Sequence, residues 1–182
     1  MDNGESSYRR FLAGDDSAFG DIMDKYRHGL IFFINRYLRD LDASEDVAVE
    51  VFTEVFVSPK KYNFKVSLKT YLYMLGRSRA LNVLKRRKII ETVSLSEAEN
   101  VLSDEKTPEE YMLADERKRR VNEALERLSE DMRTAVHLVY FEELSYRETA
   151  KIMKKSEKQV DNLLYRAKKE LHAILGKEGE SL

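Results

Sequence analysis

The sequence predicts an all-helical protein made of two small domains joined by an acidic linker, and three observations support this fold class. The 182 residues include only two prolines and seven glycines, which leaves few residues for the tight turns of a sheet-rich fold. Apolar residues recur three and four positions apart along most of the chain, as they do on one face of an α-helix. A serine-rich and acidic stretch without this period separates the two helical parts.

Four helices are expected in the first domain, which we place within residues 1–90. Ser17 can cap a long helix whose apolar residues lie on one broad face as far as Tyr37. Asp42 or Ser44 can begin the next helix, which carries a valine-rich apolar stripe. Four apolar stripes of this width can bury one common core.

The other two helices of this domain are expected after Pro59, which ends the second helix. Ser67 can cap the third helix. Residues 76–79 predict a break, because the segment begins with glycine, a poor helix former. The fourth helix then leads into the basic run Lys85–Lys88.

The linker is expected at residues 91–106, which are rich in serine and acidic residues and show no helical period. The second domain is placed at residues 107–182. Its first helix should begin at Thr107, because a capping threonine followed by Pro108 is typical of a helix start.

Charge is distributed unevenly although the formal net charge is only −1. From Ser58 to Ile90 there are ten lysine or arginine residues and no acidic residue, whereas from Glu91 to Glu116 there are nine acidic residues and one lysine. A solvated helix face is one explanation for such a run, but 33 residues without a compensating acid favour a nucleic-acid partner.

Aromatic and cationic residues alternate within this basic block. Bases that leave the DNA stack can lie on aromatic rings while cations hold the phosphates. The aromatic candidates are Tyr62, Phe64, Tyr71 and Tyr73, of which Phe64 and Tyr73 fit a core position equally well.

The second domain contains the pattern of a helix-turn-helix, a DNA-binding motif. Ser129 caps the helix that precedes it, and Ser145 caps a short helix that ends at Met153. Lys154 and the residue after it form a tight turn, and Ser156 caps a longer helix. The apolar positions of that longer helix are Val160, Leu164, Ala167, Leu171 and Ile174, spaced alternately by four and three.

The opposite face of the longer helix carries the side chains expected to meet DNA. Asparagine and glutamine can bond adenine through two hydrogen bonds, arginine can do the same with guanine, and lysine holds phosphates. The residues of this predicted interface are Ser156, Lys158, Gln159, Asn162, Tyr165, Arg166, Lys168 and Lys169.

Both domains contain segments that resemble parts of bacterial RNA polymerase sigma factors, and they occur in the expected order. Phe141–Ala150, followed by Val160 and Leu164–Lys168, resembles their C-terminal promoter-binding domain. Asp42–Asp46 with Glu50–Phe52 resembles the helix that such factors place on the clamp of RNA polymerase, and Phe64 with Lys69–Tyr73 and Leu81–Arg87 resembles their promoter-melting segment. With two domains and a linker, the chain resembles the extracytoplasmic-function (ECF) group.

The resemblance implies a function for each part. The first domain would bind core RNA polymerase through Asp46, Glu50 and Glu54 and would read and open the minus-ten promoter element. The second domain would read the minus-thirty-five element, and the linker would pass through the polymerase cleft. An anti-sigma protein is a further expected partner. The residues implied to bind the minus-ten element and the melted strand are Lys61, Lys69, Tyr71, Arg77, Ser78, Arg79, Asn82, Lys85, Arg86 and Arg87.

Several positions depart from the usual pattern of this family. Tyr71 stands where tryptophan is common, and Ser78 stands where an asparagine usually helps to hold a flipped base. Asp161 and Leu163 replace residues that are usually basic, and Lys154 occupies a turn position where glycine is frequent. These departures bear on which DNA sequence the protein prefers, and they weaken the family resemblance less.

Composition excludes or disfavours several other classes. The chain has no cysteine, which excludes disulfides and cysteine-based metal or catalytic sites. Its longest apolar run, Leu30–Ile34, is far shorter than the roughly 20 residues that span a bilayer, and its start lacks the pattern of a signal peptide. We therefore expect a cytoplasmic protein without membrane insertion, cofactor, metal or small-molecule substrate.

Two other functions are weighed against the sigma-factor interpretation. A one-component regulator would use the same helix-turn-helix to bind an operator as a dimer, but such a protein does not need the basic block of the first domain. An enzyme is disfavoured because the three histidines are scattered and no phosphate-binding loop or nucleophile motif is present.

Overall fold

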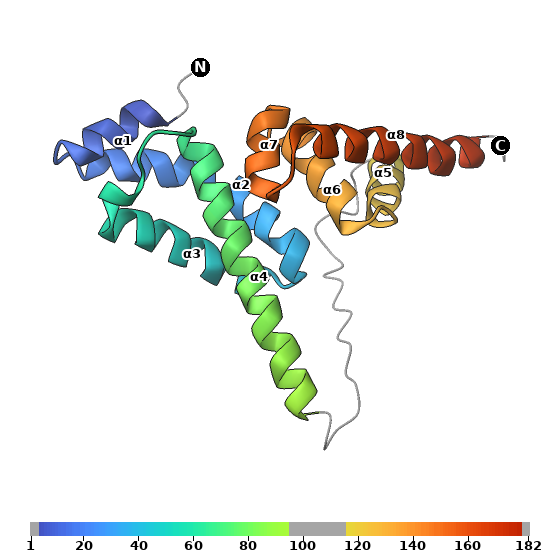
Figure 1. Cartoon of the computed structure of the whole chain (residues 1–182), viewed down its shortest axis with the longest axis horizontal. Coiled ribbons are helices and arrows are strands. Elements are labelled where there is room, and N and C mark those ends of the chain that lie inside the picture. The colour runs from blue at the N-terminus through green and yellow to red at the C-terminus, as the bar shows by residue number, and fades with distance from the viewer. Residues whose placement is uncertain (1–3, 95–115, 180–182) are drawn as a thin grey trace.

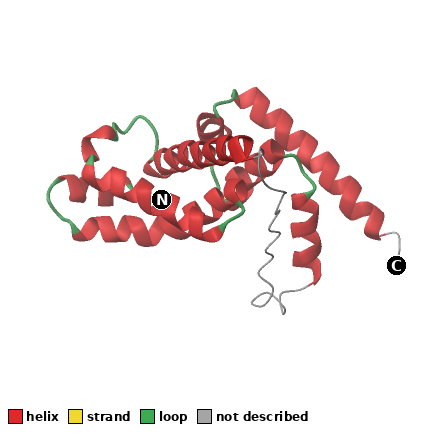
Figure 2. Cartoon of the chain, turned by 90° about the horizontal axis from the view of Figure 1, so that it is seen from below, coloured by secondary structure: helices red, strands yellow, loops and turns green. Residues whose placement is uncertain are grey.

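The computed structural model describes residues 4–94 and 116–179 of the chain. Within these two ranges every regular element is a helix and none is a strand (Figure 1, Figure 2). The predicted fold class of two helical domains is confirmed. Figure 1 shows the helices of the first domain on one side and α5 to α8 on the other, with the long helix α4 between α3 and the second domain.

The first domain has four α-helices as predicted, but they are not the same four: α1 was not predicted, and the last two predicted helices are one helix, α4. Its elements are α1 (Glu5–Leu12), α2 (Ser17–Leu38), α3 (Leu41–Val57), the 3-10 turn η1 (Pro59–Lys61) and α4 (Leu68–Ser94). The helix α1 buries only Tyr8 and Phe11, too few apolar residues to show a period in the sequence. The Tyr8 hydroxyl donates a hydrogen bond to the Pro59 carbonyl at 2.8 Å, which fixes α1 to the turn after α3.

The predicted apolar stripes of α2 and α3 are buried, but both helices begin differently from the prediction. Ser17 is the first residue of α2 and donates its hydroxyl to Asp15 rather than capping the helix. The helix α3 is capped by Asp40, whose carboxylate accepts a hydrogen bond from the Ala43 amide at 3.0 Å. The prediction of Asp42 or Ser44 as the start is wrong, because Asp40 supplies the cap and the helix begins at Leu41. Ser44 is buried and bonds to the Asp40 carbonyl.

The predicted break at residues 76–79 is also wrong, since α4 runs without interruption from Leu68 to Ser94. A Cβ atom at Gly76 would lie 2.9 Å from Leu30 Cδ1 and 3.4 Å from Ile34 Cδ1. Glycine therefore lets α4 approach α2 closely and does not end a helix here. At the start of α4, the Ser67 hydroxyl accepts from the Thr70 amide at 3.2 Å, as expected of a cap.

The second domain consists of α5 (Glu116–Glu126), α6 (Glu130–Val136), the π-helical turn η2 (His137–Phe141), α7 (Tyr146–Met153) and α8 (Glu157–Gly179). The predicted cap Ser129 accepts from the Met132 amide at 3.4 Å. The first four residues of the predicted linker, 91–94, belong to α4. The rest of the linker and the predicted helix start at Thr107 lie outside the described residues.

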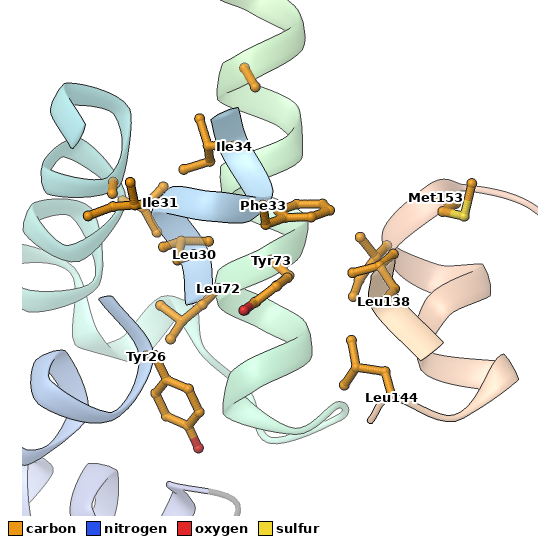
Figure 3. Packing of buried hydrophobic residues seen from close by; sticks show 14 of the residues in the cluster. Tyr26, Leu30, Ile31, Phe33, Ile34, Leu72, Tyr73, Leu138, Leu144 and Met153 are labelled. Carbon is orange, nitrogen blue, oxygen red and sulfur yellow. The ribbon is translucent and has the colours of Figure 1, made fainter. Parts of the chain in front are cut away.

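The two domains share a continuous hydrophobic cluster. Figure 3 shows Phe33 of α2 and Tyr73 of α4 facing Leu138 and Leu144 of the second domain. All four side chains are at most 6% exposed, so the domains are packed against each other and not merely adjacent.

Candidate nucleic-acid interface

The helix-turn-helix is formed by α7 and α8, and side chains hold the first turn of each helix. The Ser145 hydroxyl accepts from the Glu148 amide at 3.3 Å, and Glu148 Oε2 accepts from the Ser145 amide at 3.0 Å. Ser156 and Gln159 are paired in the same way at the start of α8, with distances of 3.1 and 2.8 Å. Such reciprocal pairs satisfy amides that a helix start leaves without partners.

Two contacts of Lys155 hold the turn between the two helices. Lys154 adopts the left-handed backbone conformation with φ 55°, and the Lys155 amide bonds to the Ala150 carbonyl at 2.9 Å. The Lys155 ammonium also lies 2.9 Å from the Asp131 carboxylate of α6. The predicted tight turn is therefore present, with buried Ala150 in the helix that leads into it.

The first half of α8 divides into two faces as predicted, whereas Leu171 and Ile174, the last two predicted apolar positions, are only half-buried. Val160, Leu164 and Ala167 are buried against the rest of the domain. The predicted DNA-facing residues are all exposed, and the ring of Tyr165 is exposed to 71%. They are Ser156, Lys158, Gln159, Asn162, Tyr165, Arg166, Lys168 and Lys169. Gln159 differs from the others because its amide oxygen already caps the helix.

The predicted DNA-binding residues of the first domain are spread along α4 and the turn before it. Ser78, Asn82, Lys85 and Arg86 are exposed, and their spacing places them along one side of α4. Arg87 is half-buried and lies 2.7 Å from the Asp40 carboxylate.

The aromatic residues of the basic block fall into two groups. Tyr62 and Tyr73 are buried in the core. Tyr73 is therefore a packing residue and does not offer its ring to a DNA base. Phe64 and Tyr71 are half-buried, and the ring of Tyr71 lies 5.2 Å from that of Tyr62. Burial raises the pKa of the Tyr71 hydroxyl, so this ring remains a neutral surface near physiological pH. Tyr71 and Phe64 are therefore the aromatic residues of this block with exposed ring surface.

The three acidic residues predicted to face polymerase have different environments. Asp46 is exposed on α3. Glu50 lies 2.8 Å from the Arg79 guanidinium, which also pairs with Glu54. Glu54 accepts a further hydrogen bond from Lys61 at 2.9 Å, and bonds from Lys61 and Arg79 lower the pKa of its carboxyl group.

The two described ranges contain neither a candidate membrane span nor a candidate metal site. No helix there combines the length and apolar character that would let it cross a bilayer. No group of three or more histidine or acidic residues in these ranges is arranged to hold a metal ion.

Comparison with known proteins identifies the family. The family model described as Sigma-70 region 2 matches residues 22–89, and the model described as Sigma-70, region 4 matches residues 118–171. The RNA polymerase sigma-H factor of Pseudomonas aeruginosa is 30% identical over 174 residues, covering 91% of this chain and 90% of that protein. The ECF RNA polymerase sigma-E factor of Haemophilus influenzae is 31% identical over 167 residues, covering 87% and 88%. The chain belongs to the ECF group of sigma-70 factors.

Solved structures support the fold of this sigma factor. The sigma factor RpoE of Bartonella quintana, solved with the anti-sigma factor NepR, matches with a TM-score of 0.64 at 18% identity, covering 86% of this chain and 97% of that one. CnrH, solved with the cytosolic domain of CnrY, matches with a TM-score of 0.66 at 16% identity, covering 97% and 99%. Sigma factors direct promoter-specific transcription initiation, and the alternative of a one-component regulator is not favoured.

In this sigma factor, two of the cations predicted to bind DNA, Lys69 and Arg77, have partners within the protein. The Lys69 ammonium lies 2.8 Å from Glu142 Oε2 and donates a hydrogen bond of 2.6 Å to the Glu142 carbonyl. Arg77 interacts with Tyr37 of α2, in its own domain, and Tyr37 in turn interacts with Thr134 of α6. Lys69 is therefore engaged in a contact between the domains, whereas Arg77 is engaged within the first domain.

The Glu142 carboxylate is the centre of this contact. Its side chain is only 12% exposed, and Oε1 lies 3.3 Å from Nε2 of His137. Burial raises the pKa of Glu142, but hydrogen bonds from His137, Lys69 and Tyr73 outweigh it and lower the pKa to about 2. Burial lowers the pKa of the His137 ring. At neutral pH the contact thus contains an ionised carboxylate beside a neutral imidazole and a lysine.

Sequence reasoning did not single out Glu142, Glu148 or His137 as parts of a site. The spacing of Ser145 and Glu148 is that of a capping box and was visible in the sequence. Glu148 also accepts hydrogen bonds from the Ser67 and Thr70 hydroxyls, at 2.9 and 3.1 Å. The sequence around Glu148 does not predict these bonds, because Ser67 and Thr70 are far away along the chain.

Proposed function

We propose that this sigma factor reads the minus-thirty-five element with α8 and the minus-ten element with α4, while α3 binds core RNA polymerase. The observation that carries the proposal is the division of α8 into a buried apolar stripe and an exposed polar face. A helix held in this way can enter the major groove with its first turns toward the base edges.

On α8 we assign base reading to Asn162 and Arg166. Both are exposed, and both side-chain types make paired hydrogen bonds with a base. Lys168 and Lys169 lie further along the helix and are assigned to phosphates, which position the protein without reading sequence. Gln159 is assigned mainly to the start of the helix, because its oxygen accepts from the Ser156 amide.

On α4 we assign contact with the minus-ten element to the exposed side formed by Ser78, Asn82, Lys85 and Arg86. A base that leaves the stack would lie on the half-exposed ring of Tyr71, and such stacking contributes about 1–3 kcal/mol per base. Lys61, Arg79 and Arg87 are held in ion pairs, Lys69 pairs with Glu142 of the second domain, and Arg77 interacts with Tyr37 of α2. These five would bind DNA only after exchanging their present partners.

On α3 we assign the main polar contact with polymerase to Asp46, because its carboxylate is exposed. Glu50 and Glu54 are shared with Arg79 of the same domain. Exposed apolar side chains on the same helix, Val49, Phe56 and Val57, add surface that a protein partner can bury.

We further propose that an anti-sigma protein controls this factor in the cytoplasm and that the factor catalyses no reaction itself. The solved sigma factors with similar folds, which have anti-sigma NepR or the CnrY cytosolic domain bound, support the first part. Its membership of a family of transcription initiation factors supports the second part.

Run-off transcription with purified bacterial core polymerase tests the proposed function. On a library of promoter fragments, the factor should yield discrete transcripts that core polymerase alone does not produce. A protein that binds duplex DNA as a dimer but yields no transcript with core polymerase would instead fit a one-component regulator and would contradict the proposal.

A further inference from the structure

The helix α1 lies outside both ranges matched by the sigma-factor family models, which cover residues 22–89 and 118–171. Figure 1 shows it beside the segment that leads from α3 to α4. Three residues of α1 contact that segment, and because they are three and four positions apart they lie on one face of the helix. They are Glu5, Tyr8 and Arg9. The helix α1 therefore supports the part of the first domain that leads into α4.

Buried Tyr8 holds both the backbone and the rings of this segment. Its hydroxyl donates to the Pro59 carbonyl at 2.8 Å. Its ring meets the rings of Tyr62 and Phe64 edge to face, at 5.0 and 6.0 Å between centroids. Tyr62 in turn donates its hydroxyl to the Val66 carbonyl at 2.7 Å. The segment before α4 is thus held at both of its ends.

Phe64 lies among these contacts in an unusual backbone conformation. Its φ is 59°, in the left-handed region that bulky side chains rarely adopt. Such a conformation persists only where the surrounding contacts hold it, and it is common at sites that bind a ligand. The Tyr62 ring lies 4.6 Å from the Phe64 ring, and the guanidinium carbon of Arg9 lies 4.3 Å from the centre of the Phe64 ring. Phe64 therefore forms a platform under Arg9.

Arg9 is exposed, and its guanidinium rests on a ring and not on a carboxylate. Among the described residues no acidic side chain forms an ion pair with it, and Glu5, one turn earlier, interacts with Tyr62. By contrast, Lys69 and Arg79 of the basic block are paired with carboxylates. A guanidinium stacked on a ring keeps its N–H donors at the rim, where they match two oxygens of a phosphate. Arg9 is therefore a cation that is fixed in place and available to a phosphate.

Arg9 also lies at the end of a row of side chains that begins at Tyr71, the residue proposed to receive an unstacked base. The Tyr71 ring lies 5.2 Å from that of Tyr62, which contacts Phe64. Phe64 then carries the Arg9 guanidinium. Rings that stack on bases and cations that follow the backbone are the combination that holds single-stranded DNA. A strand with one base on Tyr71 can therefore continue along this row to α1.

We propose that Arg9 is a phosphate contact for the melted DNA strand and that Phe64 is the residue that positions it. The helix α1 then extends the strand-binding surface of α4 to the N-terminal part of the domain. This inference rests on the proposed function, because it takes the first domain as the part that binds the melted strand.

The test measures the anisotropy of a labelled single-stranded oligonucleotide bound to the full chain at a series of salt concentrations. Arg9→Gln should weaken binding about tenfold at low salt, as expected for the loss of one charge-assisted contact. The dependence of log affinity on log salt concentration should also become shallower by about 0.7, the contribution of one phosphate in a single strand. Arg9→Lys should keep the slope but bind more weakly than wild type, because an ammonium lacks the planar fork that stacks and binds two oxygens.

The matched control is Arg10→Gln, which removes the same charge from the next residue of α1. Arg10 pairs with Asp15 at 2.6 Å and with Asp21 at 3.2 Å, so its loss should leave the salt slope as in wild type. Circular dichroism checks that each variant keeps its helices. An unchanged slope in Arg9→Gln, or an equal decrease in Arg10→Gln, would overturn the proposal.

A double-mutant cycle tests the positioning role of Phe64. In a chain with Phe64→Leu the guanidinium has no ring to rest on, so Arg9→Gln should then cost clearly less than in wild type. An equal cost in the two chains would show that Phe64 does not position Arg9 and would overturn that part of the proposal.

Tyr71→Ala, titrated in parallel, separates this inference from the proposed function. Weaker binding by Tyr71→Ala together with an unchanged slope in Arg9→Gln would retain the strand-binding role of α4 and overturn the contact with α1. A shallower slope in Arg9→Gln together with unchanged binding by Tyr71→Ala would retain the Arg9 contact and remove the assignment of base stacking to Tyr71.

Discussion

Arg79 of α4 donates a hydrogen bond of 2.8 Å to Glu50 of α3 and therefore joins a residue predicted to bind DNA to one predicted to bind polymerase. The same guanidinium pairs with Glu54, and these acidic partners raise the pKa of Arg79 against the effect of its burial. The two surfaces of the first domain are thus coupled electrostatically. A charge change at Glu50 will therefore disturb both surfaces. A charge change at the exposed Asp46 tests the predicted polymerase-binding surface without altering the pair with Arg79.

The first prediction is that Asp46→Lys weakens binding to core polymerase by about tenfold, because a reversed charge opposes the complementary surface of a partner. Co-purification with core polymerase and a titration of labelled factor measure the effect. Asp24→Lys is the control, since Asp24 is an exposed acid of α2 and gives the same change in net charge. Equal weakening by both variants would mean that α3 has no special part in polymerase binding.

The second prediction concerns the close packing of α2 and α4 at Gly76. Gly76→Ala should lower the free energy of unfolding by about 1 kcal/mol, because overpacking costs about 1–3 kcal/mol and the better helix propensity of alanine offsets part of it. Gly20→Ala, in a helical position with no neighbouring atom within 4 Å, should instead raise it by about 0.5–1 kcal/mol. Urea unfolding followed by circular dichroism measures both. If the two variants gain stability equally, glycine is not needed for the helix contact.

The third prediction concerns the turn of the helix-turn-helix. Lys154→Gly should stabilise the protein by about 0.5–1 kcal/mol, because glycine adopts the left-handed conformation without the clash of a Cβ atom, while its more flexible unfolded state opposes part of the gain. Lys154→Ala removes the same charge but keeps the clash, and it should give no such gain. Thermal unfolding of the three proteins distinguishes strain from charge. A gain of equal size in the alanine variant would attribute the effect to charge.

The fourth prediction is a pH dependence that originates at Glu142. The pKa of Glu142 is about 2 in the folded protein against an ordinary value of 4.5, so the ionised carboxylate stabilises the fold above about pH 4.5. This contribution is lost as the pH falls toward 2. Glu142→Gln should lower the free energy of unfolding by about 1.5–3 kcal/mol at pH 7, the range for hydrogen bonds to charged groups. The difference from wild type should shrink as the pH is lowered to about 3.

Urea unfolding of wild type and Glu142→Gln at a series of pH values measures this convergence. Glu143→Gln serves as the control, because Glu143 is exposed and next in the sequence, and it should show a small difference at every pH. A difference for Glu142→Gln that stays constant between pH 7 and pH 3 would contradict the assignment.

Local features were the most predictable part of the fold from sequence. The burial of Val160, Leu164 and Ala167 followed from their spacing, and the caps at Ser129, Ser145 and Ser156 followed from residue type at the start of an apolar pattern. Each of these depends on neighbours within a few residues, so a single sequence contains the needed information.

Features that depend on distant residues were predicted poorly or not at all. Gly76 was interpreted as a helix break because glycine disfavours helix, whereas its role depends on Leu30 in another helix. Likewise, no pattern near Lys69 indicates that Glu142 will meet it. The set of residues on the exposed face of α8 was predictable from the sequence. The partners of the cations on α4 could not be predicted, because they depend on how distant helices pack.

The central claim is that α8 reads promoter sequence through its exposed face. Transcription from a library with randomised upstream elements, using core polymerase with wild type, Asn162→Ala, Arg166→Ala or Lys168→Ala, tests it most directly. The account predicts that the first two variants relax the selected upstream sequence at a cost of about 1–3 kcal/mol on the preferred element, while Lys168→Ala lowers the yield from all templates alike. A selected sequence that is the same for wild type, Asn162→Ala and Arg166→Ala would contradict the account.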